Sequence, residues 1–91
     1  MAGSPQHATL VAATVTTLTL DNGYEHIEVT NVDGTAIVYF TTDGTTPVAA
    51  ATGTQVLSAV PGAALTVDNG QNAAVVKLIS AGTPKVSARC F

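Results

Sequence analysis

Charged residues are scarce in this chain of 91 residues, at 10% of the total against about a quarter in ordinary soluble domains. Three Lys and Arg against six Asp and Glu give a formal net charge of −3. The chain therefore lacks the basic surface on which nucleic-acid binding depends, and we expect no nucleic-acid partner. No apolar run approaches the roughly 18 residues of a membrane span, so we expect no membrane partner either.

Aromatic residues and cysteine are nearly absent as well. Aromatics are 4% of the chain, with no Trp, so the core must be built from Val, Leu, Ile and Ala and must be small. A single cysteine, Cys90, excludes an internal disulfide and fits a reducing compartment, where it behaves as a small apolar residue. An intermolecular disulfide is the alternative. A lone domain of this length has a thin margin of stability.

Thr, Ser, Asn, Gln, Gly and Ala take the place of charge on the expected surface. Burying a Thr costs far less than burying an unpaired charge, so a surface of this kind is typical of one that another subunit covers. The composition therefore favours assembly. A GC-rich genome that favours Ala, Gly and Thr codons is the alternative explanation.

Apolar residues recur with a period of two between turn signals, and no segment has a convincing helical period. The strands expected from this pattern cover residues 14–20, 24–31, 35–42, 54–60, 64–67, 74–80 and 85–91, with a loop at 48–53. About seven short strands separated by turns predict an all-β protein, an antiparallel β-sandwich or small barrel of immunoglobulin-like or jelly-roll-like type.

Alternation within these strands predicts which side chains are buried. In residues 24–31, Glu25, Ile27, Val29 and Asn31 share the inward face, and His26, Glu28 and Thr30 share the other. Residues 35–42 are the most apolar stretch, so we expect the central strand there, with both faces buried.

Two Asp-Asn-Gly segments, at residues 21–23 and 68–70, mark turns. Asn-Gly meets the requirement of a type I′ turn for positive φ, so each segment predicts a β-hairpin between the strands on either side of it.

The N-terminal segment, residues 1–13, is uncharged and precedes the first clear strand, so we divide the chain into an arm at 1–13 and a single β-sandwich domain at 14–91. An uncharged arm can add a strand to a neighbour's sheet edge; a frayed end without a role is the alternative. The candidate interaction residues are Ala2, Gly3, Ser4, Pro5, Gln6 and His7. No secretory signal is evident, because the segment lacks a basic region and a long apolar region.

Three groups of residues are candidates for a chemical site. His26 and Glu28 lie two apart on one strand face, but no nucleophile or further ligand accompanies them. The segment Asn31-Val32-Asp33-Gly34 offers too few carboxylates for calcium. Cys90 has no identifiable His partner. We therefore expect no catalytic residue, no metal site, no cofactor and no enzymatic activity.

Four segments in order carry a resemblance to a known kind of protein. They are Ile27-Glu28-Val29-Thr30-Asn31, Thr42-Asp43-Gly44-Thr45-Thr46-Pro47, Val60-Pro61-Gly62-Ala63 and Ser80-Ala81-Gly82-Thr83-Pro84-Lys85-Val86-Ser87. Together they resemble a recurring type of small, Thr/Ala/Gly-rich, all-β virion protein of tailed bacteriophages, common among phages of actinobacteria. The resemblance covers residues 27–87.

This resemblance implies a capsid decoration protein, assembled in the host cytoplasm and placed on the capsid exterior of the virion. The implied partner is the major capsid protein, bound by a homo-oligomer, with a trimer favoured, that cements neighbouring capsomers. The long leading arm of the best-known decoration proteins is missing. The alternatives are a minor tail or head-fibre component, or a carbohydrate-binding module, although Tyr24 and Tyr39 are the only Tyr or Trp that could form a sugar platform.

Overall fold

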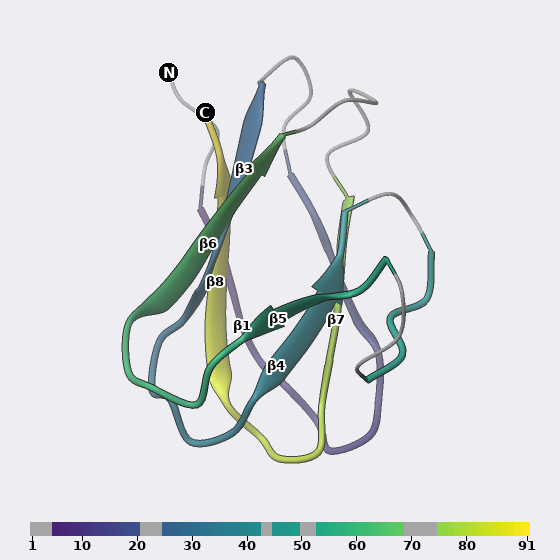
Figure 1. Ribbon diagram of the computed structural model, residues 1–91, viewed down its shortest axis with the longest axis vertical. Coiled ribbons are helices and arrows are strands. Elements are labelled where there is room, and N and C mark those ends of the chain that lie inside the picture. The colour runs from purple at the N-terminus through teal and green to yellow at the C-terminus, as the bar shows by residue number, and fades with distance from the viewer. Residues whose placement is uncertain (1–4, 21–24, 43–44, 50–52, 69–74) are drawn as a thin grey trace.

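The computed structural model describes residues 5–20, 25–42, 45–49, 53–68 and 75–91, and these form two antiparallel sheets of four strands packed face to face (Figure 1). The strands are β1 (Gln6–Thr9), β2 (Thr16–Thr19), β3 (His26–Asn31), β4 (Val38–Thr41), β5 (Gln55–Leu57), β6 (Ala63–Asp68), β7 (Val75–Ser80) and β8 (Lys85–Cys90). The fold is an all-β sandwich, as the sequence predicts. Each of the seven expected segments coincides with one strand, and β1 is additional.

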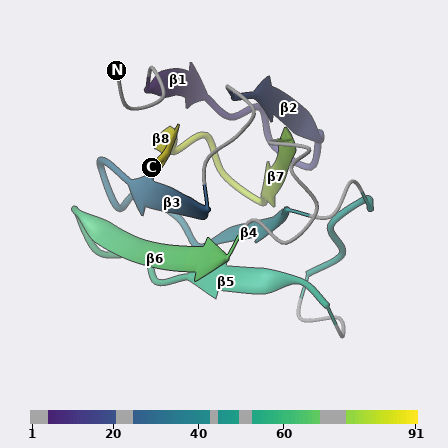
Figure 2. The ribbon, with the colours of Figure 1, turned by 90° about the horizontal axis from the view of Figure 1, so that it is seen from above.

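Strands that follow one another in the chain mostly lie in different sheets. Sheet A has the order β1-β8-β3-β6 and sheet B the order β2-β7-β4-β5. Among these strands only β4 and β5 are both consecutive and paired. Seen from above, β1 and β2 lie along one side of the sandwich, and β5 and β6 lie side by side along the other (Figure 2).

This connectivity corrects the two predicted hairpins. Residues 21–23 and 69–70 lie outside the described residues, but the strands that flank them settle the pairing. β2 pairs with β7 while β3 pairs with β6 and β8, and β6 and β7 belong to different sheets. The prediction was wrong because Asn-Gly signals a chain reversal without specifying whether the chain returns to the same sheet.

The core lies between the sheets and takes one face from each. Its buried side chains are Leu10, Leu18, Leu20, Ile27, Val29, Val38, Phe40, Leu57, Val76, Leu78, Val86, Ala88 and Cys90. The inward face predicted for Ile27, Val29 and Asn31 is confirmed, since all three are fully buried. Glu25 was wrongly predicted on the same face: it precedes β3 and is exposed, because a charged side chain there stays in water.

The prediction that β4 is buried on both faces was wrong. β4 is an inner strand of sheet B, and its Val38 and Phe40 are fully buried, but Ile37 just before it is 43% exposed and Tyr39 is only half-buried. A sandwich has two layers, so each sheet has one covered face; the apolar residues of the second face of β4 have no third layer against which to pack.

Part of the segment assigned to an N-terminal arm lies in the sandwich. β1 pairs with β8 in the same sheet, with Gln6 opposite Ala88, and Leu10 is buried in the core. Residues Ala2, Gly3 and Ser4 lie outside the described residues. In the segment 48–53, which we expect to be a loop, the described residues 48, 49 and 53 do not belong to a strand.

Phe40 is the largest fully buried side chain among the described residues. We expect Phe40→Ala to lower the free energy of unfolding by about 3–5 kcal/mol, because it removes a ring from a small core and leaves a cavity. Ile37→Ala is the control, since that side chain is half in water and should cost about 1 kcal/mol or less. Denaturant unfolding measures both, and equal losses would contradict the assignment of the buried face.

Candidate interaction surface

Four loops meet at one end of the sandwich, the lower end in Figure 1. They follow strands β1, β3, β5 and β7 and comprise residues 10–15, 32–37, 58–62 and 81–84, all of them described. We call this set of residues the loop end. Loops on a rigid scaffold are where sandwich proteins most often bind, so the loop end is the first candidate for a functional surface.

The side-chain amide of Asn31, the last residue of β3, ties two of these loops together. Asn31 is fully buried. Its Nδ2 donates to the carbonyl oxygens of Ala36 at 2.8 Å and of Ser58 at 3.0 Å, and its Oδ1 accepts from the N–H of Gly34 at 3.1 Å. Its backbone carbonyl accepts from the N–H of Gly62 at 2.8 Å. A buried amide with three partners fixes the loops after β3 and β5 in one arrangement.

Gly34 allows these two loops to touch. It has φ of +64°, in the left-handed region that favours glycine, and a Cβ there would overlap the backbone of Val60 and Pro61. The loop after β3 therefore packs backbone against backbone on the loop after β5.

Ser80, the last residue of β7, connects the remaining loops. Its buried Oγ donates to the carbonyl oxygen of Ile37 at 2.7 Å and accepts from the N–H of Gly82 at 3.2 Å. Its carbonyl oxygen accepts from the N–H of Ala13 at 2.8 Å. All four loops are thus hydrogen-bonded to a neighbour, and the loop end is held in a fixed shape.

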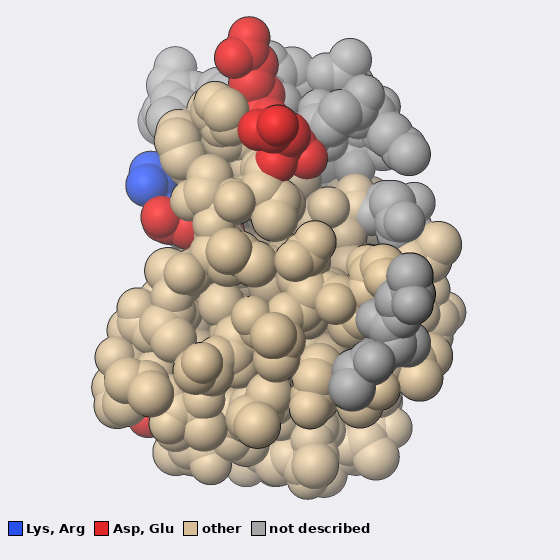
Figure 3. Space-filling model, in the orientation of Figure 1, with Lys and Arg blue, Asp and Glu red and all other residues tan. Residues whose placement is uncertain are grey.

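The outer surface of the loop end is apolar and carries no net charge. Val11, Val32, Ile37 and Val60 are all more than two-fifths exposed. The charged residues in the four loops and at their borders are Asp33 and Lys85, which have opposite signs. Figure 3 shows the face that carries β5 and β6: charged side chains gather toward its upper end, and the part toward the loop end is almost free of them.

The Asp33 carboxylate is held in its charged form. Burial acts to raise its pKa, but the backbone N–H groups of Lys85 and Thr35, the hydroxyl of Thr35 and the charge of Lys85 together lower the pKa below the usual value. The side-chain oxygens of Asn31 and Asp33 thus accept N–H groups of the chain itself, as is typical of turns.

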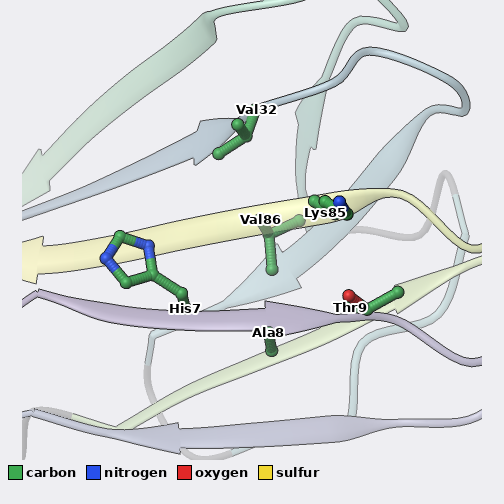
Figure 4. Close-up of a pocket in the computed structure, with 6 residues that line it drawn as sticks. All are labelled: His7, Ala8, Thr9, Val32, Lys85 and Val86. Carbon is green, nitrogen blue, oxygen red and sulfur yellow. The ribbon is translucent and has the colours of Figure 1, made fainter.

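A shallow groove of about 330 Å³ lies beside the loop end (Figure 4). It is lined by His7, Ala8 and Thr9 from β1, Lys85 and Val86 from β8, and Val32. His7 is one of the predicted interaction residues; it is exposed, as are Pro5 and Gln6. The imidazole, hydroxyl and ammonium groups on its rim can donate hydrogen bonds, but no carboxylate or thiol lines the groove to act as a nucleophile.

His26 and Glu28 lie on the outer face of sheet A, as predicted, but each has a different partner. His26 Nδ1 lies 3.3 Å from Asp68 Oδ1, and Glu28 Oε1 accepts from Arg89 Nε at 2.9 Å. The Arg89 guanidinium also stacks over the Phe91 ring, 4.6 Å from its centre. Such exposed pairs contribute up to about 1 kcal/mol each to stability, so they form a weak surface network.

Sequence reasoning missed Asp68 and Arg89 as partners. The register places Asp68 opposite His26 and Arg89 opposite Glu28 on neighbouring strands. Only the strand pairing brings these residues together. Cys90, the other candidate, is buried in the core.

In the part of the chain that the structure describes, no three His, Cys, Asp or Glu residues lie close enough to hold a metal ion, and no helix is long and apolar enough to cross a membrane. The molecule belongs to the class of two-layer antiparallel β-sandwiches with a fixed loop end. Comparisons with protein-family models, with curated proteins and with solved structures gave no match.

Two glycines with positive φ test whether the loop contact matters. We expect Gly34→Ala to lower the free energy of unfolding by more than about 3 kcal/mol, because the new Cβ overlaps backbone atoms as well as straining φ. The matched control is Gly62→Ala, which has φ of +81° and open space around the Cβ position, and should cost about 1 kcal/mol. Thermal unfolding of both variants gives the comparison, and similar losses would mean that the two loops do not pack together.

Asn31→Asp tests the buried amide. The carboxylate has nearly the same shape but cannot donate to the carbonyls of Ala36 and Ser58. At neutral pH we therefore expect the free energy of unfolding to fall by about 3 kcal/mol or more. Burial raises the folded-state pKa of this Asp above its unfolded value, so the loss should be smallest below pH of about 4 and grow as pH rises through the folded pKa. Unfolding measured against pH, relative to the wild type, checks this, and a loss that does not change with pH would contradict it.

Proposed function

We propose that this protein is a non-enzymatic structural component of a bacteriophage particle, a capsid decoration protein. In this role it binds the shell of the major capsid protein on the exterior of the virion, after assembly in the host cytoplasm, and stabilises the head. It acts as a homo-oligomer, with a trimer favoured.

The observation that carries the proposal is the uncharged surface. Toward the loop end, the face in Figure 3 is nearly devoid of Lys, Arg, Asp and Glu, and the loops expose Val side chains. Covering such a surface in an assembly costs little desolvation of charge. A fixed loop arrangement also loses little conformational freedom on binding.

The resemblance supports the same role, because three of its four segments lie together in the fold. Ile27–Asn31 ends at the buried amide, and the segments Val60–Ala63 and Ser80–Ser87 contain loop-end residues that contact it or its neighbours. These three segments therefore form one connected structural region, whereas the fourth, at residues 42–47, follows β4 at the other end of the sandwich.

Part of the predicted interaction segment lies at an edge of sheet A. Gln6 and His7 lie on β1, an edge strand of sheet A with β8 on one side. An edge strand presents backbone N–H and C=O groups, which bind an added strand from another protein. In this proposal the segment that includes Ala2 to His7 provides an attachment edge.

The test is a mass-spectrometric inventory of virions that contain the protein, followed by stripping and adding it back. We expect many copies in a fixed ratio to the major capsid protein. Heads without the protein should disassemble at a lower temperature, because a repeated contact gains strength through multivalency. Adding purified protein back should restore the disassembly temperature of untreated heads.

A few copies that fractionate with tails would contradict this proposal and favour a tail or head-fibre component. Binding to a glycan array, with no binding to heads, would favour a carbohydrate-binding module.

A further inference from the structure

We propose that the loop end is a self-association surface, on which a second copy of this chain docks through its own loop end. This inference does not depend on the phage assignment. It assigns the homo-oligomeric contact to one end of the sandwich and leaves the β1 edge available for another partner.

Four exposed apolar side chains at one end are the first observation. Val11, Val32, Ile37 and Val60 come from three different loops, and the hydrogen bonds of Asn31 and Ser80 hold those loops in place. Apolar side chains gathered on a preorganised surface mark a protein contact, because burying them is favourable and little order must be imposed.

The charge pattern of this end fits a second copy. A contact between identical ends is possible only if the end does not repel itself. Asp33 in the loop end and Lys85 at its border interact within one copy and carry opposite signs, so the end is neutral, and each can also face the opposite charge of the neighbouring copy. A two-fold dimer and a closed ring of three both allow this pairing.

Asp68, one of the acidic residues that give the chain its negative charge, does not oppose the contact. Asp68 pairs with His26 at the far end of β3, five residues from Asn31. At a rise of about 3.3 Å per residue, this pair lies roughly 17 Å from the loop end, beyond the Debye length of about 8 Å at physiological salt.

The size of the loop end sets an upper limit on the area that a contact can bury. The Cα atoms extend 25 by 17 Å across the two shorter axes of the sandwich, and the loop end closes the long axis. With side chains added, the end presents at most roughly 800 Å² per copy, the size of a standard protein interface. The association should therefore depend on protein concentration.

The chain supplies matched pairs of valines for the test. Val11 and Val60 at the loop end are 59% and 56% exposed, while Val48 and Val56, outside it, are 59% and 55% exposed. Val11→Glu and Val60→Glu thus make the same chemical change as Val48→Glu and Val56→Glu, at equal exposure and in a different place. Circular dichroism and thermal unfolding confirm that each variant folds.

Sedimentation equilibrium of the full chain over a range of concentrations is the measurement. We expect the wild-type mass to rise from that of the 9.1 kDa chain to that of a dimer or trimer. Val11→Glu and Val60→Glu should each raise the protein concentration at which half of the chains are associated by at least about tenfold. The reason is that association would bury a carboxylate without a partner. The two control variants should behave as the wild type.

Three results would overturn the inference: a wild-type monomer at every concentration, equal weakening by the control variants, or an oligomer that neither loop-end variant weakens. If one loop-end variant fails to fold, the other, in a different loop, still gives a result.

Binding of the same four variants to heads separates this inference from the proposed function. A wild-type monomer that binds heads through the loop end would overturn the self-association and support decoration. An oligomer formed through the loop end that never binds heads would support the self-association and contradict decoration.

Discussion

The buried amide of Asn31 is the interaction on which the arrangement of the loop end depends. An amide removed from water must find partners, and here its donors reach carbonyl oxygens in two loops that are distant in the sequence. Since Gly34 donates to the same side chain and packs against the next loop, one residue at the end of β3 sets the position of both loops. The rest of the surface follows from that constraint.

The crossing connectivity explains why such a constraint is needed. Because almost every connection passes between the sheets, each loop at this end joins strands that are not hydrogen-bonded to each other. A hairpin turn is held by the strands that it joins, but a crossing loop is not, so it needs contacts of its own. Asn31 and Ser80, both buried polar residues at strand ends, provide them. The molecule thereby acquires two unlike ends, one apolar and fixed and one that carries the His26–Asp68 pair.

Much of the fold could be predicted, because local alternation reports directly on burial. The alternation in β3 correctly identifies Ile27 and Val29 as core residues. The same reasoning failed for β4, because Ile37 to Phe40 are apolar or aromatic on both faces of the strand. Only the number of layers in the sandwich decides which of these faces is covered. The loop end was not foreseen, since an exposed Val in a loop has no periodic signal.

The sequence by itself determined the scarcity of charge, the small aliphatic core and the two-residue period that makes strands. It also determined the turn positions, since Asp, Asn, Gly and Pro restrict the backbone locally. Tertiary structure alone decided which strands pair, which residues face Glu28 and His26, and which loops Asn31 joins. These relations connect residues far apart in the chain, and the free energy that selects them comes from burying one face of each sheet against the other, a property of the whole sandwich and of no single segment.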